Sequence, residues 1–131
     1  RARGRRLILD TNALSAFVDG TPEVSAILRL QHRAAIPVIV HGEFRYGILG
    51  SRHRKRYEDW LATHLPHFDL LAITAGTTPA HASLRATLKR LGRPISANDA
   101  WIAALAMQHG LPILSRDVHF DAVPDVRRIG W

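Results

Sequence analysis

Short apolar runs alternate with longer amphipathic segments along this chain. We expect strands at about residues 6–10, 36–40, 68–73, 112–115 and 126–129. Between them, the spacing of apolar residues predicts helices over about 12–19, 22–34, 42–49, 52–65, 79–91 and 99–109. Strands that alternate with helices are typical of a parallel sheet covered on both faces. The predicted fold class is therefore α/β, with three α/β/α layers around a central, mainly parallel sheet.

Residues that favour helix ends agree with this pattern. Thr21-Pro22 and Thr78-Pro79 each place a capping threonine before a proline at the first helical position. Gly92 and Gly110 each follow a predicted helix, where glycine commonly ends the helix.

The size and composition of the chain predict one globular domain, residues 1–131. The chain has 47% apolar residues and no cysteine, and it shows neither an apolar run long enough for a membrane span nor a signal peptide. We therefore expect a cytoplasmic protein without membrane contact. Residues 1–6 hold four arginines and form a basic lead that is either disordered or not native.

Positive charge is abundant and clustered. The formal net charge is +7, from 18 basic and 11 acidic residues. Such a surface suits a polyanion of phosphodiesters, although each cluster taken alone is equally well explained as a solvated helix face. The basic side chains expected to contact a nucleic-acid backbone are Arg52, Arg54, Lys55 and Arg56 in one cluster, and Arg85 and Lys89 four residues apart on one helix face.

Four acidic residues, Asp10, Glu43, Asp99 and Asp117, each lie where an apolar strand is expected to end or a helix to begin. The carboxyl ends of the strands of an open α/β sheet share one crevice. Carboxylates that converge there repel one another unless a divalent cation neutralises them, and hard oxygen ligands favour Mg²⁺ or Mn²⁺. The pattern predicts a metal site.

Each of these acids also has an ordinary structural explanation. Asp99 and Glu43 lie near predicted helix starts, where the helix dipole stabilises a carboxylate, and Asp117 could cap a turn. Asn98 could support the site, but its commoner role is that of a helix N-cap. His119 is expected to pack or hydrogen-bond near the site. The sequence has no HExxH motif, no Gly-rich phosphate loop and no pattern of a nucleophilic serine.

Four segments carry a family resemblance. They are Leu9-Asp10-Thr11-Asn12, Glu43 with Gly47, the block from Gly92 to Ala104, and Ser115-Arg116-Asp117-Val118-His119-Phe120. In this order and spacing, which cover most of the chain, the sequence resembles PIN-domain ribonucleases of the VapC toxin type.

The resemblance implies a PIN-like fold and an endoribonuclease that hydrolyses RNA with a metal-activated water. Asp10, Glu43, Asp99 and Asp117 would hold Mg²⁺ or Mn²⁺, and Asn12 and Ser115 would position the carboxylates. Asp121 would either bind the metal through water or cap a turn, the role we favour. The implied partners are a second copy of the chain and a small antitoxin that blocks the pocket.

Two alternatives remain open from the sequence. The chain could be a housekeeping or DNA-directed PIN nuclease without an antitoxin. It could also be a nucleic-acid-binding PIN module that has lost catalysis, although its complete set of four acids argues against this.

Overall fold

Five parallel strands form the centre of the structure, whose computed structural model describes residues 6–131. The sheet order is β3-β2-β1-β4-β5, and all four strand pairings are parallel. Residues 1–5 of the expected basic lead lie outside the described residues, whereas Arg6 begins β1. The strands are β1 (Arg6–Leu9), β2 (Arg33–Pro37), β3 (Asp69–Leu71), β4 (Ile113–Leu114) and β5 (Arg128–Ile129).

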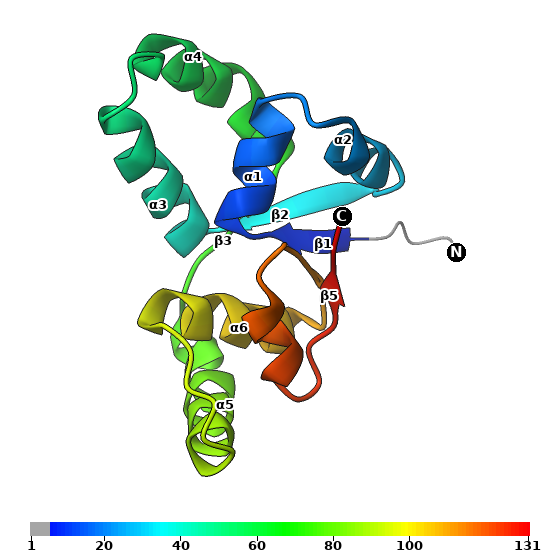
Figure 1. Cartoon of the computed structure of the whole chain (residues 1–131), viewed down its shortest axis with the longest axis vertical. Helices are drawn as coiled ribbons and strands as arrows, with labels where there is room; N and C mark the ends of the chain where they lie inside the picture. The colour runs from blue at the N-terminus through cyan, green and yellow to red at the C-terminus, as the bar shows by residue number, and fades with distance from the viewer. Residues whose placement is uncertain (1–5) are drawn as a thin grey trace.

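Helices cover both faces of this sheet, as Figure 1 shows. One layer contains α1 (Thr11–Val18), α2 (Pro22–Arg29), α3 (Val38–Leu49) and α4 (Arg54–His64), and the other contains α5 (Thr78–Arg90) and α6 (Ala97–His109). The predicted three-layer α/β fold is therefore confirmed. Short 3₁₀ helices are η1 (Leu65–His67), η2 (Ala75–Thr77) and η3 (Val118–Ala122). No helix in the described part of the chain is long and apolar enough to cross a membrane.

The core lies between the sheet and these two helical layers. Leu7, Ile8 and Leu9 of β1 are completely buried, because β1 is the central strand and both of its faces are covered. Helix α6 is buried from Ile102 to Ala106 and packs against α5. Its apolar character on all sides, which the sequence shows, is typical of a helix inside a domain.

Three predicted boundaries are wrong around β2. The helix expected over 22–34 ends at Arg29, and the strand expected at 36–40 lies at 33–37. Helix α3 begins at Val38 rather than near residue 42. A short apolar run such as 36–40 does not distinguish a strand from a buried helix start. Pro37 keeps an extended backbone (φ −60°, ψ 145°) and precedes the first turn of α3. As a result, Glu43 lies in the second turn of α3 rather than at its beginning.

The pairing of β1 with β4 brings two distant parts of the sequence to one edge of the sheet. Leu9 is in register with Leu114, and the Asp10 N–H donates to the Leu114 carbonyl oxygen at 3.1 Å. Asp10 and Ser115 therefore follow neighbouring strands at their carboxyl ends. This is the edge at which open α/β sheets bind ligands.

The expected glycine ends of α5 and α6 are confirmed. Gly92 and Gly110 have φ values of +68° and +64°, in the left-handed region that residues with a Cβ rarely adopt.

We expect Gly110→Ala to lower the free energy of unfolding by about 1–2 kcal/mol, the cost of a left-handed conformation for an L-residue. A Cβ at this position meets nothing within 4 Å, so the cost is conformational rather than steric. Gly47→Ala is the matched control, because Gly47 lies inside α3 with equally open surroundings. There, alanine should stabilise by about 0.5–1 kcal/mol. Urea denaturation measures the free energy of unfolding of both variants. Equal stability of Gly110→Ala and Gly47→Ala would contradict the left-handed conformation of Gly110.

Candidate metal centre

Asp10 is the most buried of the four predicted acids, with 5% of its surface exposed. It ends β1 and is the N-cap of α1, where its Oδ1 accepts the Thr11 N–H at 2.8 Å. Burial raises the pKa of its carboxyl group, in opposition to the hydrogen bonds from Ser115 and Thr11, which stabilise the charged form. The negative charges of Glu43 and Asp117 raise this pKa further.

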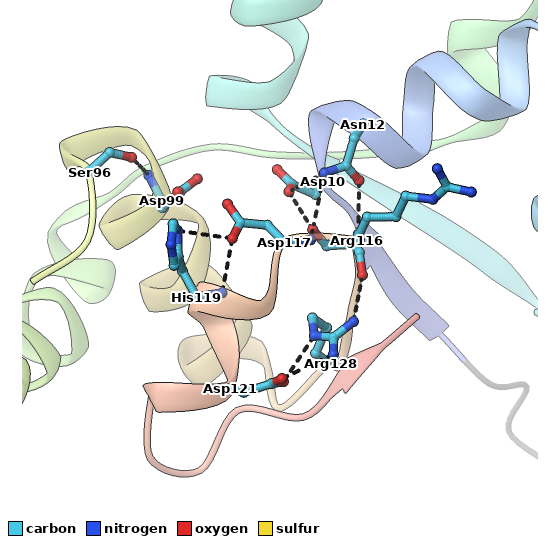
Figure 2. A network of polar contacts seen from close by, with 10 residues as sticks. Asp10, Asn12, Ser96, Asp99, Arg116, Asp117, His119, Asp121 and Arg128 are labelled. Atoms are coloured by element: carbon cyan, nitrogen blue, oxygen red, sulfur yellow. Dashed lines mark hydrogen bonds and ion pairs between the residues drawn. The ribbon is translucent and has the colours of Figure 1, made fainter. Parts of the chain in front are cut away.

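Ser115 connects the acids of two strands. Its side chain is completely buried, and its hydroxyl group donates to Asp10 Oδ2 at 2.6 Å. Ser115 Oγ in turn accepts the Asp117 N–H at 2.9 Å and the Asn12 side-chain amide at 3.4 Å. A hydroxyl group has one donor and two acceptor positions, so all of them are used. Figure 2 shows Asp10 and Asp117 close together at this edge of the sheet.

Asn12 adds a second link between the same segments. Its amide nitrogen lies 3.4 Å from Asp10 Oδ2, and its Oδ1 accepts the Arg116 N–H at 3.2 Å. The first turn of α1 is therefore joined to the loop that follows β4. The structure places both Asn12 and Ser115 beside Asp10, where the family resemblance implied a supporting role.

Glu43 reaches the same edge from helix α3. Its Oε1 accepts the Thr11 hydroxyl at 2.7 Å, and its Oε2 accepts the Asn98 side-chain amide at 3.1 Å. The two bonds turn the carboxylate toward α1 and α6. The alternative of Asn98 as an N-cap is wrong, because Asn98 lies inside α6 and Ser96 caps that helix.

Asp99 lies in the first turn of α6. The Ser96 side chain caps α6 and accepts the Asp99 N–H at 3.1 Å. A serine three residues before an acidic residue is the sequence pattern that indicates such a cap. The pKa of Asp99 is raised first by burial, then by the charge of Asp10, and more weakly by Asp117 and Glu43. The negative charges of the other three predicted acids therefore all act on Asp99.

Asp117 and His119 complete the site from η3. Asp117 is the N-cap of η3, and its Oδ1 accepts the backbone N–H of His119 at 2.9 Å. The His119 Nδ1 lies 3.0 Å from the same oxygen, so the His119 side chain lies near the site, as expected. Ligand atoms of Asp99, Asp117 and His119 lie within 4.8 Å of one another. The sequence interpretation did not include His119 among the metal ligands.

Asp121 has a different partner. Its two oxygens accept hydrogen bonds from Arg128 at 2.9 and 3.0 Å, and this guanidinium group holds the Asp121 pKa below its usual value. Arg128 also donates to the Ser115 carbonyl oxygen at 3.1 Å. In Figure 2, Asp121 lies apart from the other carboxylates, with Arg128. These contacts give Asp121 an ion pair with Arg128 in place of the expected turn cap, and they favour this structural role over coordination through water.

The predicted RNA-contacting side chains lie in two places. Arg54 pairs with Glu58 at 3.0 Å and Lys55 with Asp59 at 2.9 Å, while Arg56 lies over the Tyr57 ring. These contacts fit a solvated face of α4, and RNA binding by this cluster, Arg52 included, stays a prediction. The second cluster consists of Arg85 and Lys89. These two side chains line a cavity of about 390 Å³ beside α5, together with Pro94 and Ile95.

The chemistry of the donors fits a divalent cation. Three aspartates and one glutamate offer hard oxygen atoms, and their hydrogen bonds leave acceptor positions free on each carboxylate. Mg²⁺ and Mn²⁺ prefer such oxygen ligands. Burial is the main cause of the raised pKa values of Asp10 and Asp99, and a bound cation would offset the repulsion that adds to it.

Comparison with known proteins agrees with this fold. The PIN domain family matches residues 7–126, so the chain belongs to the PIN domain family. Within that family it is homologous to VapC ribonuclease toxins. It is 33% identical to Ribonuclease VapC4 of Mycobacterium tuberculosis over 96 residues, which cover 72% of this chain and 74% of the relative. Ribonuclease VapC5 of the same organism is 30% identical over 118 residues, or 88% and 86% of the two chains.

A solved structure supports the same relationship. The crystal structure of VapBC-5, a member of the VapBC family of toxin–antitoxin systems from Mycobacterium tuberculosis, is similar to this chain with a TM-score of 0.76 at 27% identity. The match covers 96% of this chain and 98% of the other. PIN nucleases are metal-dependent, which agrees with the acidic cluster.

We expect Asp99→Asn to raise the melting temperature of the metal-free protein near neutral pH. The raised pKa shows that burial and repulsion outweigh the helix dipole, so ionised Asp99 destabilises the folded state. This destabilisation is present above the raised pKa of the folded state and disappears as the pH falls below the ordinary value of 3.8. Thermal denaturation of wild type and Asp99→Asn in the presence of a chelator, at neutral and at acidic pH, measures this destabilisation.

Asp121→Asn provides a control of opposite sign. The pKa of Asp121 is lowered by Arg128, so its ionised form stabilises the fold above the ordinary value of 3.8, and this contribution is lost as the pH falls through the lowered pKa. This variant should melt lower than wild type near neutral pH. A lower melting temperature for Asp99→Asn as well would contradict the expected repulsion.

Proposed function

We propose that this chain is a metal-dependent endoribonuclease that hydrolyses RNA phosphodiester bonds, with Mg²⁺ or Mn²⁺ held by Asp10, Glu43, Asp99 and Asp117. The observation that carries the proposal is the convergence of these four acids at one sheet edge, where the other three all raise the pKa of Asp99. Homology to VapC ribonucleases supports RNA as the substrate.

The protein fixes its carboxylates through hydrogen bonds within the fold. Ser115 and Asn12 orient Asp10, while Thr11 and Asn98 orient Glu43. These bonds limit the rearrangement needed when a cation binds. A bound divalent ion supplies a Lewis acid that lowers the pKa of a water molecule and offsets charge on the phosphoryl oxygens. Asp99 and Asp117 are more exposed than Asp10, which suits groups that face the substrate.

Water is the proposed nucleophile, because the hydroxyl groups at the site have other partners. Ser115 is buried and donates to Asp10, and Thr11 donates to Glu43. A hollow of about 740 Å³ beside Glu43 gives a nucleotide room to approach. Tyr46 lies in its lining with 81% of its surface exposed, as an aromatic ring that can stack on a base.

The partners are inferred from the relatives. Because the similar VapBC-5 belongs to a toxin–antitoxin family, we propose that a small antitoxin inhibits this chain. We also propose that the chain is a single nuclease domain that forms a homodimer. A cytoplasmic location stays a prediction. A housekeeping nuclease is less well supported, because the similar VapBC-5 belongs to a toxin–antitoxin family. A module without catalysis is also less well supported. The chain has all four acids, although the raised pKa values of Asp10 and Asp99 indicate that their charges destabilise the fold.

Asp99→Asn should reduce kcat/KM for RNA cleavage at least about a hundredfold, because a metal site supplies several kcal/mol of charge stabilisation in the transition state. Asp121→Asn should retain cleavage, since Arg128 occupies that carboxylate. The assay uses purified protein, single-stranded RNA and single-stranded DNA of the same sequence, with Mg²⁺ or Mn²⁺. Undiminished cleavage by Asp99→Asn would contradict the site, and a preference for DNA would support the DNA-directed alternative.

The salt dependence of RNA affinity separates the two basic clusters. Each phosphate contact on a single strand contributes about 0.7 to the slope of log affinity against log salt. If Arg85 and Lys89 both contact RNA, replacing both with alanine should reduce the slope by about 1.4. Replacing Arg54 and Lys55 tests the other cluster, whose side chains already have acidic partners. Binding is measured in Ca²⁺, to prevent cleavage, and an unchanged slope removes a cluster from the RNA surface.

A further inference from the structure

We propose that His119 is a metal ligand, and that Asp99, Asp117 and His119 form a mixed nitrogen–oxygen cation site that favours Mn²⁺ over Mg²⁺. This inference rests on the metal-dependent function proposed above and goes beyond it, because it concerns a residue outside the four acids and the identity of the ion.

The positions of the ligand atoms carry this inference. One atom from each of the three side chains lies within 4.8 Å of the other two. Ligand atoms around one ion, with bonds of about 2.0–2.2 Å, are roughly 3–4 Å apart. A displacement of about 1 Å, within the reach of small side-chain rotations, therefore brings all three into coordination.

Three features of the chain place His119 there. The backbone N–H of His119 donates to Asp117 Oδ1, which fixes the turn of η3 beneath the site. The imidazole Nδ1 lies 3.0 Å from the same oxygen, and Asp99 approaches from a different element, α6. Figure 2 shows the His119 ring beside the carboxylates of Asp117 and Asp99.

A purely structural role explains this placement less well. The His119 side chain is 72% exposed, so it adds little to the core. A simple pair between His119 and Asp117 would need only these two residues. The approach of Asp99 places a second carboxylate within 4.8 Å of the other two ligand atoms, and a cation between the three side chains would offset the repulsion of two like charges at that distance.

The nitrogen ligand predicts a preference between ions. Mg²⁺ requires near-ideal octahedral oxygen coordination and loses its water reluctantly. Imidazole is a softer ligand that suits first-row transition metals, and Mn²⁺ is the member of that series with the weakest affinity and the strongest preference for oxygen, so one nitrogen among oxygen ligands separates it from Mg²⁺ without excluding it. The side of the centre formed by Asp10 and Glu43 offers only oxygen atoms and suits either ion. Loss of the imidazole should therefore weaken Mn²⁺ binding much more than Mg²⁺ binding.

Isothermal titration of the full chain with Mn²⁺ and with Mg²⁺ tests this selectivity. His119→Ala should weaken Mn²⁺ binding at least about tenfold and Mg²⁺ binding by less than about threefold, as expected for loss of a nitrogen ligand. His32→Ala is the matched control, because His32 is also exposed but precedes β2, outside the site. Pulsed electron paramagnetic resonance of the Mn²⁺ complex should show coupling to a nitrogen nucleus in wild type and in His32→Ala, and none in His119→Ala.

The outcomes separate this inference from the proposed function. If wild type binds both ions and His119→Ala changes neither affinity, or changes both equally, His119 is not a selective ligand and the nuclease proposal stands. A nitrogen coupling that survives in His119→Ala also overturns the inference. If wild type binds neither ion, both proposals fail. Selective loss of Mn²⁺ affinity together with loss of the nitrogen coupling supports the assignment.

Discussion

Electrostatic repulsion among four carboxylates is the constraint that the rest of this structure has to accommodate. Two unit charges about 4 Å apart at a protein surface interact by about 4 kcal/mol at an effective dielectric constant of 20. That energy is a large part of the 5–15 kcal/mol by which a domain is stable. The raised pKa values of Asp10 and Asp99 show this repulsion together with the effect of burial. The fold therefore has to hold the acids in place with strand pairing, packing and hydrogen bonds that offset this repulsion.

The centre meets this constraint differently on its two sides. Asp10 is buried, and the fully used hydroxyl group of Ser115 and the amide of Asn12 hold it, so its position is set by the β1–β4 pairing. On the other side, Asp99 and Asp117 come from the starts of α6 and η3 and are more exposed. One side is thus buried and held by several hydrogen bonds within the fold, and the other is more open to solvent.

Much of this could be predicted from the sequence, because its signals are local or follow from topology. The alternation of strands and helices predicted the parallel sheet, and the family motifs located Asp10, Asp99 and Asp117 at element ends. The position of Glu43 was predicted incorrectly, since the run from Ile36 to Val40 fits a strand as well as a helix start. The approach of His119 to Asp99 depends on how η3 packs against α6, which no local pattern encodes.

The interior position of Glu43 shows how one helix can support both stability and a charged site. Val40, Phe44 and Ile48 are spaced by four residues and are at most 5% exposed, so they form the side of α3 that faces the core. Full burial of such a side chain stabilises by about 1.5–3 kcal/mol. Glu43 precedes Phe44 by one residue, about 100° around the helix, and is only partly buried. Because these three apolar anchors together outweigh the repulsion of one carboxylate, α3 can present Glu43 to the other acids without losing its place in the fold.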